Sequence, residues 1–168
     1  MDLRNARAYA PAMSKLRELI KRANATAEFL FYKHGRLEPI WHPVTKNGDE
    51  FITPQPHKDK DFAALLIRIM FNAEGVVRYV YIDEAWQLSS EDGVPQEDLE
   101  TLDYATHPKR REVIQFVAED ATEGVLLGLR RIERRDGKAT LGPLHFEKFG
   151  EVGGRFVGLL PQPHKRTQ

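Results

Sequence analysis

The clearest pattern of apolar positions lies near the start of the chain. Small or apolar residues recur there at spacings of three or four, which places them on one stripe of a helix. They are Met13, Leu16, Ile20, Ala23, Ala27 and Leu30. Pro11 suits the first turn of this helix and Gly35 suits its end. The pattern predicts a helix over residues 11–34, with the alternative that residues 29–32 already form a strand.

A hairpin is predicted after this helix. Asn47-Gly48 favours a type I′ turn, whose two central residues need positive φ, and it would join strands over residues 37–45 and 50–53. Pro39 and Pro43 each remove a backbone donor, so we expect the first of these strands at the sheet edge.

A second helix is predicted over residues 58–74 and is ended by Gly75. Five of its apolar residues recur at helical spacing and predict the face that packs on the sheet. They are Phe62, Leu65, Leu66, Ile69 and Met70.

The rest of the chain reads as consecutive strands. Residues 76–88 are apolar on both faces at first and predict a central strand. Asp136-Gly137 is a second type I′ signal. Further strands are expected over residues 111–119, 124–134, 138–146 and 155–160. The fold class is therefore α+β, with an antiparallel sheet of about five to seven strands, two helices packed on it and the order α-β-β-α-β-β-β-β-β.

Residues 89–109 form a polar segment that is too long for a plain connection, so we expect it to be mobile or functional. The length of 168 residues suits one domain, which we place at residues 1–160, followed by a polar tail at 161–168.

Composition narrows the function classes. The chain has no cysteine, which excludes disulfides and thiolate chemistry and fits a cytoplasmic setting. Lys plus Arg and Asp plus Glu both number 25, so nucleic acid is a disfavoured partner. No apolar run reaches the length of a membrane span, and no membrane association is expected.

The segment Tyr81-Ile82-Asp83-Glu84-Ala85 is similar to the Walker B strand of ATPases. That function also needs a glycine-rich phosphate loop, which the sequence lacks. Dinucleotide, nucleophile-elbow and His-Glu-x-x-His motifs are absent as well. No cofactor and no metal site is therefore predicted.

Glu84 stands out because strand alternation places it between Ile82 and Trp86. A carboxylate in that setting is partnered, exposed or raised in pKa. One interpretation is a structural ion pair with Arg78 or Arg110. The other is a functional acid, since perturbed carboxylates gather at active sites.

An enzyme built on Glu84 would be a carboxylate-based or metal-assisted hydrolase. His42 and His107 are the candidate catalytic helpers. A second acid, Glu119, would lie far from Glu84 if residues 76–88 and 111–120 pair antiparallel. The six histidines show no metal-ligand spacing, and a surface or hydrogen-bonded role is the competing interpretation for each.

The run Arg130-Arg131-Ile132-Glu133-Arg134-Arg135 is a candidate contact for nucleic acid. Arg130 and Arg134 point to one face, and Arg131 and Arg135 to the other. Phosphate contact needs arginines gathered on one face, so an edge protected against aggregation is the competing interpretation.

Trp41 and Trp86 are candidate anchors for a protein partner. Core packing is the competing interpretation, because rings of this size are mostly buried in a domain of this length.

Three segments together carry a resemblance. They are Lys33-His34-Gly35 with Pro39-Ile40-Trp41, Arg78 to Trp86, and Arg110-Arg111-Glu112-Val113-Ile114. Over about residues 25–120 the chain resembles uncharacterised small proteins of proteobacteria and their phages. The resemblance implies no activity and assigns no catalytic residue. The leading hypothesis is a small non-catalytic binding or accessory module, which would use the surface around Trp86 or the 89–109 segment.

Overall fold

The computed structural model describes residues 14–99, 104–147 and 156–162. The expected helix start at Pro11 and most of the expected polar tail lie outside these residues.

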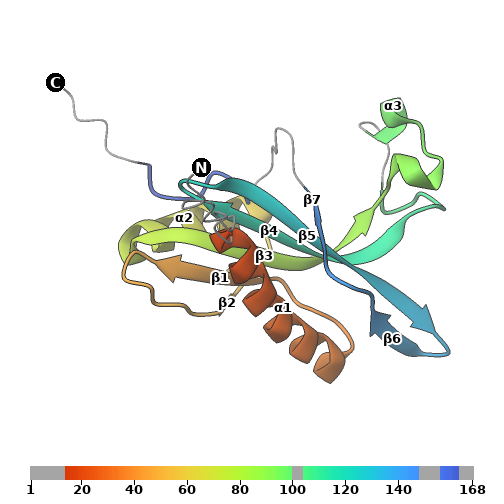
Figure 1. The fold of residues 1–168 in the computed structure, drawn as a ribbon, viewed down its shortest axis with the longest axis horizontal. Coiled ribbons are helices and arrows are strands. Elements are labelled where there is room, and N and C mark those ends of the chain that lie inside the picture. The colour runs from red at the N-terminus through yellow and green to blue at the C-terminus, as the bar shows by residue number, and fades with distance from the viewer. Residues whose placement is uncertain (1–13, 100–103, 148–155, 163–168) are drawn as a thin grey trace, which may run out of the picture.

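The described chain forms one antiparallel sheet with two long helices (Figure 1). The helices are α1 (Lys15–His34), α2 (Lys60–Glu74) and the short α3 (Gln96–Leu99), with a 3-10 turn, η1, at Ser90–Asp92. The strands are β1 (Ile40–Thr45), β2 (Thr53–Pro54), β3 (Val76–Gln87), β4 (Arg111–Asp120), β5 (Gly124–Arg135), β6 (Lys138–Leu141) and β7 (His145–Glu147). The sheet order is β2-β1-β3-β4-β5-β6, and β7 also pairs with β5. The predicted fold class is confirmed, and β3 is central as expected.

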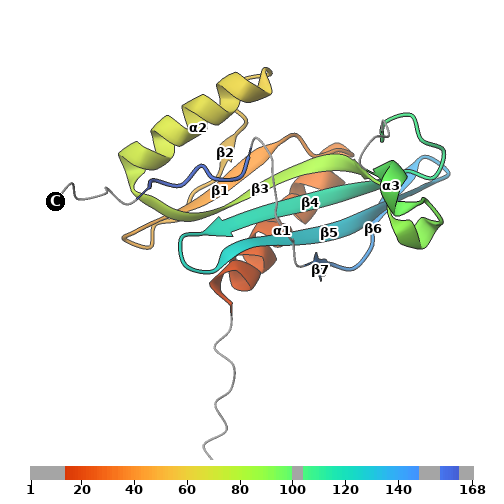
Figure 2. The same ribbon diagram turned by 90° about the horizontal axis from the view of Figure 1, so that it is seen from above.

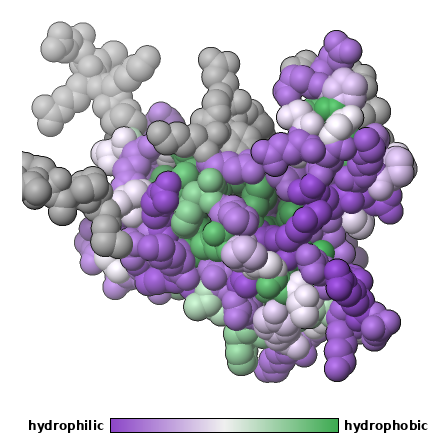
Figure 3. All heavy atoms as spheres, turned by 45° about the vertical axis from the view of Figure 1, so that its right-hand side comes forward, coloured by the Kyte–Doolittle hydropathy of each residue, from purple (hydrophilic) through white to green (hydrophobic). Residues whose placement is uncertain are grey.

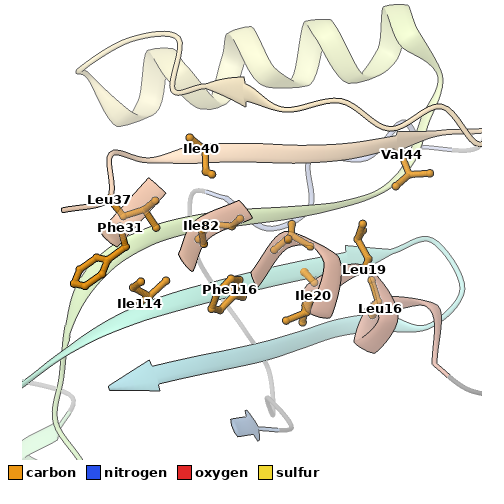
Figure 4. Close-up of a cluster of buried hydrophobic side chains, with 14 of the residues drawn as sticks. Leu16, Leu19, Ile20, Phe31, Leu37, Ile40, Val44, Ile82, Ile114 and Phe116 are labelled. Carbon is orange, nitrogen blue, oxygen red and sulfur yellow. The ribbon is translucent and has the colours of Figure 1, made fainter. Parts of the chain in front are cut away.

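The two long helices cover opposite faces of the sheet (Figure 2). Side chains of α1 pack on those of β1, β3 and β4 to form the main core (Figure 4). On the other face, Trp41, Tyr79 and Tyr81 meet Ile67 and Phe71 of α2. Residues 78, 80, 82, 84 and 86 of β3 therefore face α1. Strict alternation would add Val76 to this face, but Val76 packs on the α2 side because the pairing of β1 with β3 is irregular there.

The start of α1 is held by the turn between β4 and β5. Ser14 is the N-cap residue, and its side chain accepts a hydrogen bond from the Arg17 amide. The Glu123 carboxylate accepts from the amides of Lys15, at 2.6 Å, and Leu16, at 3.1 Å. These amides have no partner within the helix, so the distant carboxylate completes the cap.

The helix ends as predicted. Gly35 has φ of 73°, and its amide donates to the carbonyl of Phe31 at 2.7 Å. Residues 29–32 are helical, so the strand alternative is wrong.

Close packing of α1 on the sheet depends on Gly128 of β5. A Cβ atom there would lie 3.1 Å from Cγ2 of Ile20 and 3.3 Å from Cβ of Phe116. The missing side chain lets the helix approach the strand.

The two predicted hairpins differ. Asp136 and Gly137 both have positive φ, at 50° and 73°, which confirms the second type I′ turn. In the first hairpin Gly48 has φ of 85° but Asn47 is not in the left-handed region, so the predicted turn type is wrong. β1 is also not the edge strand, because the two-residue β2 lies outside it.

The last predicted strand is wrong as well. Residues 156–160 are irregular, and Arg155 lies outside the described residues. The final strand is instead β7, because the expected strand over residues 138–146 bends after Leu141 and returns to pair with β5.

The orientation of α2 is the largest departure from the sequence prediction. Its buried residues are Ala63, Ile67 and Phe71, whereas Phe62, Leu65 and Ile69 are 47%, 51% and 58% exposed. Leu66 and Met70 are half-buried. The helix therefore packs inward with Ala63, Ile67 and Phe71, and three of the five residues predicted to be buried are left outside.

Candidate functional site

Glu84 is half-buried and is bound by the backbone. Its Oε1 accepts a hydrogen bond from the amide of Leu37, the second residue after Gly35, at 2.7 Å. The two arginines expected as ion-pair partners are engaged elsewhere, Arg78 with Asp120 and Arg110 over the ring of Trp86. Glu84 therefore fixes the connection between α1 and β1.

The more unusual acid is its neighbour Asp83, which is only 8% exposed. Oδ1 accepts from Nε2 of Gln115 at 2.7 Å, and Oδ2 accepts from the hydroxyl of Tyr81 at 2.9 Å. Burial raises the pKa of Asp83. The two hydrogen bonds and the charge of Lys60 act in the opposite direction, while the charge of Glu84 adds to the increase.

Asp83 lies at an open pocket where β1 separates from β3. Its walls include Pro39, Pro54 and Pro56, and the hydroxyl-bearing Tyr81 contributes as well. The remaining lining residues are Glu38, Gln55, His57, Lys58, Lys60 and Glu84. Asp83 is the one buried charged residue among these described lining residues, since the other charged ones are half-buried or exposed.

The proposed histidine helpers are bonded away from Glu84. Nε2 of His42 lies 2.9 Å from Oε2 of Glu50, and Arg22 donates to the other oxygen of Glu50 at 2.6 Å. Burial opposes ionisation of Glu50, but these two partners outweigh it and lower the pKa.

His107 accepts a hydrogen bond from the amide of Lys109 at 3.0 Å. Within the described residues, no hydrogen bond or ion pair joins Glu84, His42 and His107, and no group of three or more His, Asp or Glu residues is arranged to hold a metal ion.

Glu119 lies away from Glu84, as the antiparallel pairing predicts. It stands opposite Tyr79, whereas Glu84 stands opposite Ile114.

The two tryptophans have different environments. Trp41 is fully buried among the aromatic rings under α2, and its indole N–H donates to Oε1 of Gln55 at 2.6 Å. Trp41 is thus core and is not available as a contact surface. Trp86 is 43% exposed, and the guanidinium of Arg110 lies 4.7 Å from the centre of its ring.

The arginine run splits between the two faces as predicted. Arg130 is buried and contacts Glu28, Asn24 and the carbonyl of Gly142. Arg134 makes a two-pronged contact with Glu112. Arg131, Arg134 and Arg135 are exposed. Arg130 and Arg134 therefore have protein partners in place of phosphate, and of these two Arg130 is the buried one.

The described parts of the 89–109 segment, which include η1 and α3, project from one end of the sheet as a separate lobe (Figure 1). Figure 3 shows that its described surface is mostly hydrophilic, while hydrophobic residues gather near the middle of that view. Arg111 ties the lobe to the sheet through an ion pair with Asp92.

The outer face of α2 is the largest group of exposed apolar side chains on any described helix. Phe62, Leu65 and Ile69 lie on successive turns. Figure 2 shows α2 as an outer layer, with no described element on its far side. We call these three residues the α2 stripe.

Comparisons with known proteins do not narrow the choice of function. No family model, curated protein or solved structure matches the chain. No described helix combines the length and the apolar character needed to cross a membrane.

Sequence reasoning singled out Glu84 and overlooked Asp83. The sequence did contain a signal for Asp83. Tyr81 and Asp83 are two residues apart, so they lie on the same face of β3, where the tyrosine hydroxyl can donate to the carboxylate.

Proposed function

We propose that the protein is a small non-catalytic interaction module that acts as a symmetric pair of copies joined through α2. The observation that supports this function is the α2 stripe. Sequence patterning favours its burial, yet the fold leaves it at the surface. Departures of this kind are expected at functional sites.

The stripe has the composition of a protein contact. Full burial of a Leu, Ile or Phe side chain is favourable by about 1.5–3 kcal/mol. Three such side chains on one helix, each roughly half exposed, form a contiguous apolar face of the kind that marks an interaction site. Their spacing of three and four residues suits packing against another helix.

A second copy of the same helix fits this face. If two α2 helices run antiparallel about the midpoint between Leu65 and Leu66, Phe62 of each copy lies beside Ile69 of the other. Such a two-fold contact is self-complementary.

The charges beside the stripe favour the same pairing. Asp61 and Arg68 are seven residues apart, so they lie on the same flank of α2, and both are exposed. In the antiparallel arrangement Asp61 of one copy comes near Arg68 of the other, and the symmetry repeats this contact. Flanking charges of this kind set partner choice and orientation in helix pairs.

The direct test is the mass of the protein in solution by light scattering over a range of micromolar concentrations. We expect a dimer that dissociates on dilution, because one helix from each copy supplies a small interface. Leu65→Glu should give a monomer. The matched control is Phe29→Glu on α1, which changes a residue that is 64% exposed and should leave the dimer intact.

Charge reversal distinguishes this pairing from non-specific association through the apolar residues. Arg68→Asp should weaken the dimer, and the double variant Asp61→Arg with Arg68→Asp should restore it. A wild-type chain that stays monomeric throughout the concentration range, or a dimer unaffected by Leu65→Glu, would overturn the proposal.

A further inference from the structure

The pocket beside the start of β1 contains a buried carboxylate without an ion-pair partner. Asp83 is 8% exposed, and its two described hydrogen bonds come from the neutral groups of Gln115 and Tyr81. Among the described residues no Lys, Arg or His nitrogen lies within the 4.0 Å of an ion pair with Asp83. A buried charge in that state is unfavourable unless something compensates it.

The carboxylate keeps capacity for further donors. Two oxygens offer about four lone-pair sites, and the described hydrogen bonds use one on each oxygen. Asp83 also borders the pocket, so a group that enters from solvent can approach these free sites.

The walls of the pocket favour a ligand with an apolar body. Pro39, Pro54 and Pro56 supply apolar surface with fixed backbone angles. Gln55 also lines the pocket and could orient a ligand. Its Oε1 already accepts from the indole of Trp41, so its amide nitrogen is the atom left for this role.

We propose that this pocket binds a small organic cation, a primary amine on a compact apolar body, with its ammonium group on the carboxylate of Asp83. The ammonium supplies the missing positive charge and up to three donors. This site is separate from the α2 stripe and does not depend on the pairing of two copies.

The ammonium group of Lys60 competes with the ligand for the carboxylate of Asp83. Its charge already acts on Asp83, and its side chain lines the same pocket but is exposed. Lys58 lines the pocket as well and is also exposed. Solvent and salt screen such exposed charges, so they repel an incoming cation less than the buried carboxylate attracts it.

The test uses three probes of one shape: benzylamine, benzyl alcohol and benzoate. Binding to the whole chain is followed by amide chemical shifts in two-dimensional NMR. We expect saturable shifts at the amides of Asp83, Gln115, Gln55 and His57 with benzylamine, at an affinity at least about tenfold better than for the other two probes, a difference of about 1.4 kcal/mol.

Two variants change the result in opposite directions. Asp83→Asn keeps the shape but removes the charge, and it should weaken benzylamine binding by at least about tenfold. Lys60→Met removes the competing charge and should strengthen it. The spectrum of each unliganded variant shows whether the fold is retained.

Three outcomes overturn the proposal. They are no saturable benzylamine shifts, equal binding of benzyl alcohol, and benzylamine binding that survives Asp83→Asn in a folded protein. Preferred binding of benzoate would reassign the pocket to anions held by Lys58 and Lys60.

Discussion

The hydroxyl of Tyr79 lies 2.6 Å from Oε2 of Glu119 across the pairing of β3 with β4, and 2.8 Å from the carbonyl oxygen of Phe156. Gly158 donates its amide to the same carboxylate oxygen at 2.8 Å. Burial, followed by the hydrogen bond and the charge of Glu119, raises the pKa of Tyr79, so its hydroxyl stays protonated and donates. This contact fastens the 156–160 segment to the sheet.

Tyr79→Phe should therefore lower the free energy of unfolding by about 1–2 kcal/mol, because it removes the buried hydroxyl donor and leaves Oε2 of Glu119 with the Gly158 amide alone. Urea unfolding at neutral pH measures the change. Tyr32→Phe removes a hydroxyl that accepts from the Leu141 amide at an exposed site, and this control should change stability much less. Equal losses in the two variants would argue against a fastening role for Tyr79.

Asp120 should make the free energy of unfolding depend on pH in the acid range. Burial alone would raise the pKa of this carboxyl, but hydrogen bonds from Thr122, Arg78 and Glu123 outweigh burial and hold the pKa below the ordinary value of 3.8. A carboxyl with a lowered pKa stabilises the fold at pH values above 3.8, and the contribution is lost as the pH falls through the folded value.

We expect Asp120→Asn to lower the free energy of unfolding by about 2–3 kcal/mol at neutral pH, since it leaves Arg78 without its charged partner. The difference from wild type should shrink as the pH is lowered below 3.8. Urea titrations across the acid range give both numbers. Asp136→Asn at the exposed β5–β6 turn is the control and should show no such trend, whereas a constant difference at every pH would contradict the ion-pair account.

The elements that could be predicted from sequence are those that depend on local chemistry. Gly35 and Gly75 end their helices in left-handed conformations, and the Asp136-Gly137 turn has the expected geometry. Each depends on one or two residues and the backbone angles they allow.

The features that could not be predicted depend on contacts between distant segments. The face of α2 that packs inward is decided by the space beside Trp41, which Ile67 and Phe71 fill and which is not encoded in the helix itself. The partner of Glu84 is the backbone amide of Leu37, and a search for basic side chains cannot find it. Periodicity alone therefore predicted where the two long helices lie in the chain, but it predicted the wrong buried face for α2.

Gly128 should tolerate no side chain. An added methyl group would lie 3.1 Å from Ile20 and 3.2 Å from Leu144, so Gly128→Ala should destabilise the fold by about 1–3 kcal/mol through overpacking. Gly142→Ala is the matched control, because its Cβ would lie at the ordinary distance of 3.4 Å from Arg131. Thermal unfolding of the two variants compares them directly. A loss for Gly142→Ala as large as that for Gly128→Ala would mean that the added methyl is not the cause.

Asp83→Asn should stabilise the protein at neutral pH, by on the order of 1 kcal/mol, because burial makes the charged form unfavourable. A carboxyl whose pKa is raised on folding reduces stability as the pH rises from its ordinary value of 3.8 through the folded value. The gain from Asn should thus disappear in acid.

Asp83→Ala provides the contrast, since it also removes the acceptors for Tyr81 and Gln115 and should destabilise the protein. Urea unfolding at neutral and acid pH distinguishes the two effects. If Asp83→Asn proved as damaging as Asp83→Ala, the carboxylate would be needed for the fold itself.

The Glu123 carboxylate that caps α1 comes from a residue 108 positions after Lys15. During synthesis the ribosome releases the helix long before that residue emerges. Ser14 can cap the Arg17 amide early, but the amides of Lys15 and Leu16 wait for Glu123 while β1, β2, α2, β3 and β4 are being made. The start of α1 can thus reach its final state only when the turn after β4 has left the exit tunnel.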